Sequence, residues 1–138
     1  MIVILDTNFL FALRSTKDKY HERVYEILES FEKESPLYFT NYLTMNETIT
    51  LAIKRSRGNV SFLEIYKELF IGADNFFQVM QITAQDIKKI VNVCKTYINS
   101  KRLLSFTDAS LIYLYQELKA DWIASFDSHF DTILNRKY

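Results

Sequence analysis

The sequence predicts an α/β fold with a central, mainly parallel sheet of four to five strands between two layers of helices. Short apolar runs rich in β-branched residues, typical of buried strands, alternate with longer segments whose apolar residues recur at helical spacing. Strands separated by helices are joined by right-handed crossovers, which makes the sheet parallel and covers both of its faces. With 138 residues and 49% hydrophobic content, the chain is long enough for one core, and we expect a single domain over residues 1–138.

Four segments are expected to form strands. Residues 2–5 are a continuous apolar run that stops at Asp6, and Asp6-Thr7-Asn8 indicates a turn. Residues 37–39 form a second short run, which the polar Thr40 and Asn41 follow. Residues 76–82 and 122–126 complete the set, and the last run ends at Asp127. The carboxyl ends of such strands are where an α/β sheet places its ligands.

Helical periodicity predicts helices over about residues 20–31, 45–57, 62–69, 87–98 and 107–118, with a short last helix over 129–134. Ser35-Pro36 ends the first of these helices and Gly58 ends the second. Thr83 and Asp86 resemble a capping box. The one cysteine, Cys94, falls on the apolar face of a predicted helix, so we expect it to pack in the core.

Composition excludes several classes of function. Lys plus Arg and Asp plus Glu number 17 each, so the formal net charge is zero, and binding of nucleic acid by bulk charge is excluded. The only glycines, Gly58 and Gly72, cannot form a phosphate-binding loop. The apolar run at residues 2–5 is interrupted too early for a secretion signal, and no stretch has the length of a membrane span. We therefore expect a cytoplasmic protein without a membrane partner.

Acidic residues gather at the predicted carboxyl edge of the sheet. Asp6 and Asp127 follow the first and last strands, and Glu47 lies on the first turn of the helix after the second strand. Asp108 lies at the start of a helix, and Asp131 shares a face with Asp127 if residues 129–134 are helical. Taken singly, each carboxylate could instead be a turn residue or a helix cap.

A cluster of this kind needs a cation. Carboxylates at close range repel one another and raise each other's pKa, unless positive charge neutralises them. Oxygen ligands without His or Cys select Mg²⁺ or Mn²⁺. His21 and His129 are expected at the surface, although His129 is next to the site in sequence.

Four motifs in this order resemble those of the PIN domain family, and the likeness covers essentially the whole chain. They are Leu5-Asp6-Thr7-Asn8, Asn46-Glu47, Ser105-Phe106-Thr107-Asp108-Ala109 and Ser125-Phe126-Asp127-Ser128-His129-Phe130. Within the family, the sequence is most similar to the VapC-type toxins of prokaryotic toxin–antitoxin pairs.

The resemblance implies a PIN-like fold and a Mg²⁺- or Mn²⁺-dependent endoribonuclease that hydrolyses RNA phosphodiester bonds. The implied catalytic and metal-binding quartet is Asp6, Glu47, Asp108 and Asp127, with Asp131 as an additional metal contact. Thr7 and Asn8 are implied as substrate contacts. A VapB-like antitoxin and a homodimer are the implied partners.

RNA would need a local basic site, because the chain as a whole is neutral. Lys54, Arg55 and Arg57 end the helix that carries Glu47, so we expect them to contact phosphates that flank the cleaved bond. Cations are also favoured at a helix C-terminus by the helix dipole alone, so a solvated helix end is the alternative.

Three other functions remain open from the sequence. A housekeeping PIN nuclease would process RNA without an antitoxin. A receiver-like signalling domain would also place an aspartate at a strand end, but such domains usually have two early acids and a late lysine. A non-catalytic interaction module would not need the complete quartet.

Overall fold

In the computed structural model, which describes residues 1–138, five strands form one parallel sheet in the order β3-β2-β1-β4-β5. The strands are β1 (Ile2–Leu5), β2 (Leu37–Asn41), β3 (Gln78–Met80), β4 (Trp122–Ala124) and β5 (Arg136–Lys137). The central strand β1 pairs with β2 and β4, with Ile4 opposite Phe39 on one side and Ile123 on the other. The predicted mainly parallel sheet is confirmed, and β3 is shorter than expected.

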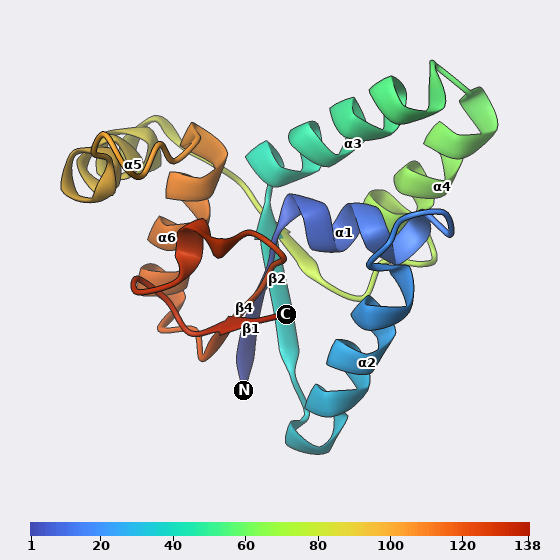
Figure 1. The fold of residues 1–138 in the computed structure, drawn as a ribbon, viewed down its shortest axis with the longest axis horizontal. Helices are drawn as coiled ribbons and strands as arrows, with labels where there is room; N and C mark the ends of the chain where they lie inside the picture. Colours follow the sequence, from blue (N-terminus) through green and yellow to red (C-terminus); the bar gives the residue numbers. More distant parts are fainter.

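Six α-helices cover the two faces of the sheet (Figure 1). They are α1 (Thr7–Arg14), α2 (His21–Phe31), α3 (Tyr42–Ser56), α4 (Val60–Ile71), α5 (Ala84–Tyr97) and α6 (Phe106–Leu118). Side chains alternate across a strand, so Val3 and Leu5 pack into the core under α1 to α4, whereas Ile4 packs under α5 and α6. Two hydrophobic cores therefore lie on opposite faces of the sheet and complete the predicted three-layer arrangement.

Helix α1 replaces the turn expected after the first strand. Asp6 accepts a hydrogen bond from the backbone N–H of Thr7 and caps a helix that starts at once. Phe9 to Leu13 are all buried, so this segment has no polar face and shows no helical periodicity in the sequence. A helix buried on all sides is hard to separate from a strand by pattern alone.

Helix α3 begins at Tyr42, three residues before its predicted start. Asn41 is fully buried, and its side-chain oxygen accepts hydrogen bonds from the backbone N–H groups of Leu43 and Thr44, at 3.0 and 3.1 Å. This cap lengthens the helix at its start and places Glu47 on its second turn instead of its first. The helix ends where Arg57 and Gly58 adopt left-handed backbone conformations, with φ of 54° and 77°.

The predicted last helix over residues 129–134 is wrong. Only a 3₁₀ turn, η2 (Ser128–Phe130), forms, and Thr132 takes a left-handed backbone conformation with φ of 71°. The chain then returns as the fifth strand, β5, whose backbone pairs with β4. A second 3₁₀ turn, η1 (Glu32–Glu34), follows α2.

The remaining expectation about packing concerns the single cysteine. Cys94 is half-buried against the core of α5 and α6, as expected. Among the aromatic side chains of the helices, Tyr66 and Phe70 belong to the core, whereas Tyr25 is exposed. None of the helices combines the length and the apolar character that crossing a membrane requires.

Candidate active site

Asp6 is the most deeply buried carboxylate at the carboxyl edge of the sheet, with 3% of its surface exposed. It leaves β1 at the start of α1, where the backbone is still extended. One carboxylate oxygen accepts a hydrogen bond from Thr7 N at 2.6 Å, and the other accepts one from the Ser125 hydroxyl at 2.6 Å. Both oxygens are thus held in fixed directions by neighbouring strand ends.

Burial raises the pKa of Asp6 from 3.8 to about 7. Desolvation is the main cause, and the negative charges of Asp108 and Asp127 add to it. The hydrogen bonds from Ser125 and Thr7 act in the opposite direction, because they favour the charged form. The repulsion shows that three carboxylates, far apart in the sequence, lie close together.

Asp108 and Asp127 enter this cluster as helix caps. Asp108 is the third residue of α6 and closes a capping box, since its carboxylate accepts a hydrogen bond from Ser105 N at 2.9 Å. Asp127 caps η2 by accepting a hydrogen bond from His129 N at 2.8 Å. Burial raises the pKa of Asp108, and the charges of Asp127 and Glu47 raise it further. The capping roles predicted as alternatives therefore exist, and these residues also belong to the acidic cluster.

His129, which we expected at the surface, is a neighbour of Asp108 and Asp127. One ligand atom each of Asp108, Asp127 and His129 lies within 4.8 Å of the others, a spacing that suits a shared metal ion. The His129 Nδ1 atom is 3.4 Å from an Asp127 carboxylate oxygen. The imidazole is exposed, as expected, but it lies at the acidic site. Its place two residues after Asp127, at a strand end, was the available signal.

Glu47 borders the cluster from α3. Its carboxylate accepts a hydrogen bond from the Thr7 hydroxyl at 2.9 Å, which joins the second turn of α3 to the first turn of α1. Its negative charge acts on Asp108, so it lies near the α6 side of the site. The structure thus brings together all four carboxylates of the predicted quartet, together with Thr7.

The backbone around the site is fixed by polar side chains from several elements. The Asn8 side chain accepts a hydrogen bond from Phe126 N at 3.0 Å, and the Ser125 hydroxyl accepts one from Asp127 N at 3.0 Å. The buried Asn41 amide donates to the Ser110 hydroxyl at 3.0 Å, which links the start of α3 to α6. Asn8 and Ser125 therefore hold the strand end that carries Asp127.

Asp131 lies in a different environment from the quartet. Its two carboxylate oxygens accept hydrogen bonds from the Arg136 guanidinium, at 2.6 and 2.9 Å, and this ion pair lowers the pKa of Asp131. Arg136 also donates to the backbone oxygen of Ser125 at 3.2 Å. The helical turn that would have placed Asp131 on the same face as Asp127 is absent.

The basic residues expected to contact RNA lie at the far end of α3. Lys54 and Arg55 are in its last turn, Arg57 is its C-cap, and all three side chains are exposed. They form no contact with the acidic cluster, and the helix separates them from it.

These features define an α/β protein with a carboxylate-rich site at the carboxyl edge of a parallel sheet. The chain belongs to the PIN domain family, whose model matches residues 3–133. Curated protein sequences, by contrast, include no match to this chain.

Three solved structures illustrate the likeness of the fold. The toxin VapC20 of Mycobacterium tuberculosis, described as cleaving the sarcin–ricin loop, has a TM-score of 0.76 at 20% identity, over 93% of this chain and 92% of that one. The VapBC2 complex of Rickettsia felis, bound to promoter DNA, has a TM-score of 0.72 at 12% identity, with 99% and 98% of the two chains covered. FitAcB of Neisseria gonorrhoeae has a TM-score of 0.62 at 16% identity, with 99% and 96% covered.

The donor set fits a hard divalent cation. Carboxylate oxygens of Asp108 and Asp127 and a ring nitrogen of His129 lie close enough to share one ion, and the carboxylate of Asp6 lies beside them. Carboxylate oxygens are the ligands that Mg²⁺ and Mn²⁺ prefer, and no thiol lies in the cluster. Burial, and to a smaller extent the charges of Asp108 and Asp127, raise the pKa of Asp6, so the ionised form of this carboxyl group is unfavourable on its own. The site therefore suits a cation, which can in turn bind an anionic group.

Proposed function

We propose that this protein is a Mg²⁺- or Mn²⁺-dependent endoribonuclease and the toxin of a VapBC-type toxin–antitoxin pair. The observation that carries the proposal is the gathering of the carboxylates of Asp6, Asp108 and Asp127 at one sheet edge, where the charges of Asp108 and Asp127 act on Asp6 and the charge of Asp127 acts on Asp108. Membership of the PIN domain family supports nuclease chemistry.

Asp6, Asp108 and Asp127 are the residues that would hold the cation, and His129 lies where it could complete the set. When bound, a divalent cation supplies charge neutralisation at the phosphate and lowers the pKa of a coordinated water molecule. Asp131 was also predicted as a metal contact, but its carboxylate is held by Arg136, so we assign it to fixing the loop after β4.

The reaction is hydrolysis at phosphorus. The oxygen of a water molecule forms a bond to the phosphorus, the bond from phosphorus to the 3′ oxygen breaks, and that oxygen takes up a proton. The products carry a 5′-phosphate and a 3′-hydroxyl. Glu47, fixed by the Thr7 hydroxyl, orients the attacking water, and no side-chain nucleophile is required. Thr7 and Asn8 keep the substrate-contact role that the family resemblance implies.

An antitoxin partner, a homodimer and a cytoplasmic location complete the proposal. The similar structures from R. felis and N. gonorrhoeae are a VapBC complex and FitAcB, and VapC20 is described as a toxin, which supports an antitoxin for this chain. A housekeeping nuclease would share the chemistry but not the partner. Expression of the chain alone should slow growth if it is a toxin, and a small adjacent antitoxin gene should relieve the effect.

The central experiment tests cleavage and metal dependence together. Purified protein is incubated with a mixed RNA pool, with Mg²⁺, with Mn²⁺ or with EDTA, and the cut ends are mapped. We expect cleavage only with a divalent ion, and none by Asp6→Asn, because a ligand charge is lost while the shape is kept. Glu29→Gln makes the same carboxylate-to-amide change on the exposed face of α2 and should cleave like the wild type. Full activity of Asp6→Asn, or cleavage in EDTA, would refute the proposal.

A further inference from the structure

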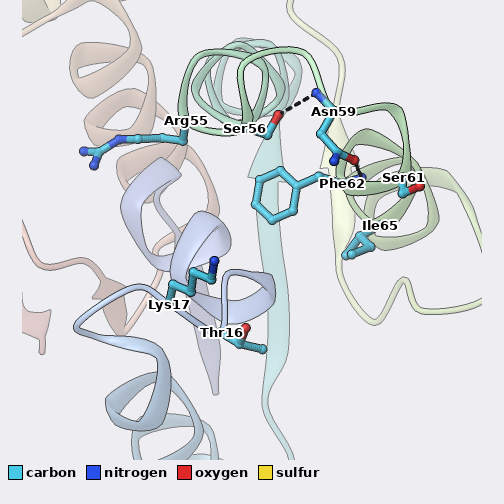
Figure 2. Close-up of a pocket in the computed structure, with 8 residues that line it drawn as sticks. All are labelled: Thr16, Lys17, Arg55, Ser56, Asn59, Ser61, Phe62 and Ile65. Carbon is cyan, nitrogen blue, oxygen red and sulfur yellow. Dashed lines mark hydrogen bonds between the residues drawn. The ribbon is translucent and has the colours of Figure 1, made fainter.

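A cavity of about 530 Å³ lies between the segment that follows α1 and the hairpin formed by α3 and α4 (Figure 2). The cations Lys17 and Arg55, the apolar side chains of Phe62 and Ile65 and four uncharged polar side chains line it. In Figure 2, Lys17 reaches up from the segment after α1, and Phe62 lies across the opening from it. None of these residues belongs to the acidic site described above.

The lining favours an anion. The whole chain has equal numbers of acidic and basic residues, yet no carboxylate lines this cavity. Asp18, next to Lys17 in sequence, has its carboxylate occupied by a hydrogen bond from Tyr20 N at 2.8 Å. Neither Lys17 nor Arg55 takes part in any of the ion pairs in the structure. Both cations are therefore free to bind a negatively charged group.

The cavity lies at a defined distance from the acidic site, because α3 connects the two. Arg55 follows Glu47 by eight residues of the same helix. At a rise of about 1.5 Å per residue, this separates them by about 12 Å along the helix axis. A stacked nucleic-acid strand advances about 3.4 Å per nucleotide, so the same span corresponds to three or four nucleotides.

Phe62 adds an aromatic surface to the cationic lining. Its half-buried ring packs edge-on against Tyr66 and Phe11, at centroid distances of 5.2 and 6.3 Å, which fixes its orientation. It also borders the cavity (Figure 2). A fixed aromatic ring beside cations is the combination that binds single-stranded nucleic acid, since bases stack on the ring and phosphates contact the cations.

We propose that this cavity is a subsite for a flanking nucleotide of a single-stranded RNA substrate, three or four nucleotides from the phosphate at the acidic site. Lys17 binds its phosphate and Phe62 stacks on its base, while Arg55, whose side chain points away from these two in Figure 2, binds the phosphate of a neighbouring nucleotide. The proposal rests on the proposed ribonuclease function and deepens it, because it makes the substrate a single strand that extends along α3.

The test measures the affinity for RNA without cleavage, in the Asp6→Asn background and, independently, with the otherwise wild-type chain in EDTA. The probes are a mixed-sequence RNA of twelve nucleotides and one of two nucleotides. Lys17→Ala and Arg55→Ala are compared with Lys95→Ala, which removes the same charge from the exposed face of α5. Phe62→Leu tests stacking and keeps an apolar side chain in place.

For the longer RNA, we expect Lys17→Ala and Arg55→Ala each to weaken binding roughly fivefold, and each to reduce the slope of log affinity against log salt by about 0.7. Phe62→Leu should weaken binding without a change of salt slope, and Lys95→Ala should bind like the parent. The dinucleotide cannot occupy the acidic site and the cavity at the same time, so it should bind the parent much more weakly than the longer RNA does.

Equal effects of Lys95→Ala and the cavity variants on the longer RNA, or a dinucleotide that binds the parent as tightly as the longer RNA, would overturn the proposal. So would a hexaglutamate peptide that binds in a Lys17-dependent manner while RNA binding does not depend on Lys17, since the cavity would then take an acidic polypeptide. These affinities need no catalysis. Absence of cleavage by the wild type would refute the proposed function and leave the measured subsite intact.

Discussion

Replacement of Asp6 by Asn should stabilise the protein in the absence of divalent cations, even though it removes a proposed catalytic residue. In the folded state the Asp6 pKa is about 7, against 3.8 for the ordinary side chain. The folded state therefore holds the proton more tightly than the unfolded state does. Stability from this group is fully present below about pH 4 and is lost as the pH rises, with the loss complete above about pH 7.

The magnitude follows from the difference in pKa. A difference of about three pKa units corresponds to about 4 kcal/mol of unfolding free energy, because each unit contributes about 1.4 kcal/mol. An amide at this position has no charge to desolvate. Its oxygen can accept from Thr7 N, and its NH₂ group can donate to the Ser125 hydroxyl, where the native hydrogen bonds are 2.6 Å long. We therefore expect most of the ionisation cost to disappear in Asp6→Asn.

Urea denaturation in EDTA at pH 4, 6 and 8 measures the effect. Asp6→Asn and wild type should be similarly stable at pH 4, and the variant should be more stable by about 2–4 kcal/mol at pH 8. Glu29→Gln is the control for a carboxylate-to-amide change at an exposed position. A difference between Asp6→Asn and wild type that is the same at all three pH values, or that favours the wild type at pH 8, would refute the reasoning.

Three further outcomes follow from the structure. Mg²⁺ at a hundred times its Kd should raise the unfolding free energy of the wild type at pH 8 by about 2.7 kcal/mol, and that of Asp6→Asn by much less. Thermal unfolding with and without the ion measures the difference. Equal stabilisation of both proteins would argue against Asp6 as a ligand. Arg136→Ala should lower the rate of RNA cleavage by about tenfold to a hundredfold, because Arg136 binds Asp131 and the Ser125 carbonyl and so fixes the loop that carries Asp127. In steady-state kinetics, kcat should fall more than KM rises. An effect on KM alone would contradict this role. Tyr66→Phe should cost about 1–2 kcal/mol of stability, measured by urea denaturation, because it removes a buried hydrogen bond of 2.8 Å to the Phe11 carbonyl, and an unchanged midpoint would show that this bond contributes nothing.

The strands and the amphipathic helices were the parts of the fold that local pattern could predict. The segment 2–5 is a short continuous apolar run because the strand is buried on both faces, and the helix around Ile90 shows a helical period because it is buried on one face. Helix α1 and strand β5 gave no such signal. The first is buried on all sides, and the second is only two residues long and exists through its pairing with β4.

Two of the four carboxylates of the site, Asp6 and Asp127, were predictable for a related reason, because each lies just after a strand. Parallel strands and right-handed crossovers bring their carboxyl ends to one edge, so residues that follow strands must meet there, whatever their separation along the chain. The order of elements therefore determined that Asp6 and Asp127 lie close together, although 120 positions separate them.

Only the tertiary structure decided the protonation state of each titratable side chain and the residues that it contacts. Asp6 holds its proton up to about pH 7 because packing removes it from water next to two other charges, and burial of that kind has no local sequence signal. His129 joins Asp108, and Asp131 instead pairs with Arg136, because the chain after β4 makes a 3₁₀ turn and returns as a strand. Sequence determines which chemical groups reach the edge of the sheet, whereas desolvation and the path of the backbone determine what each of them can do there.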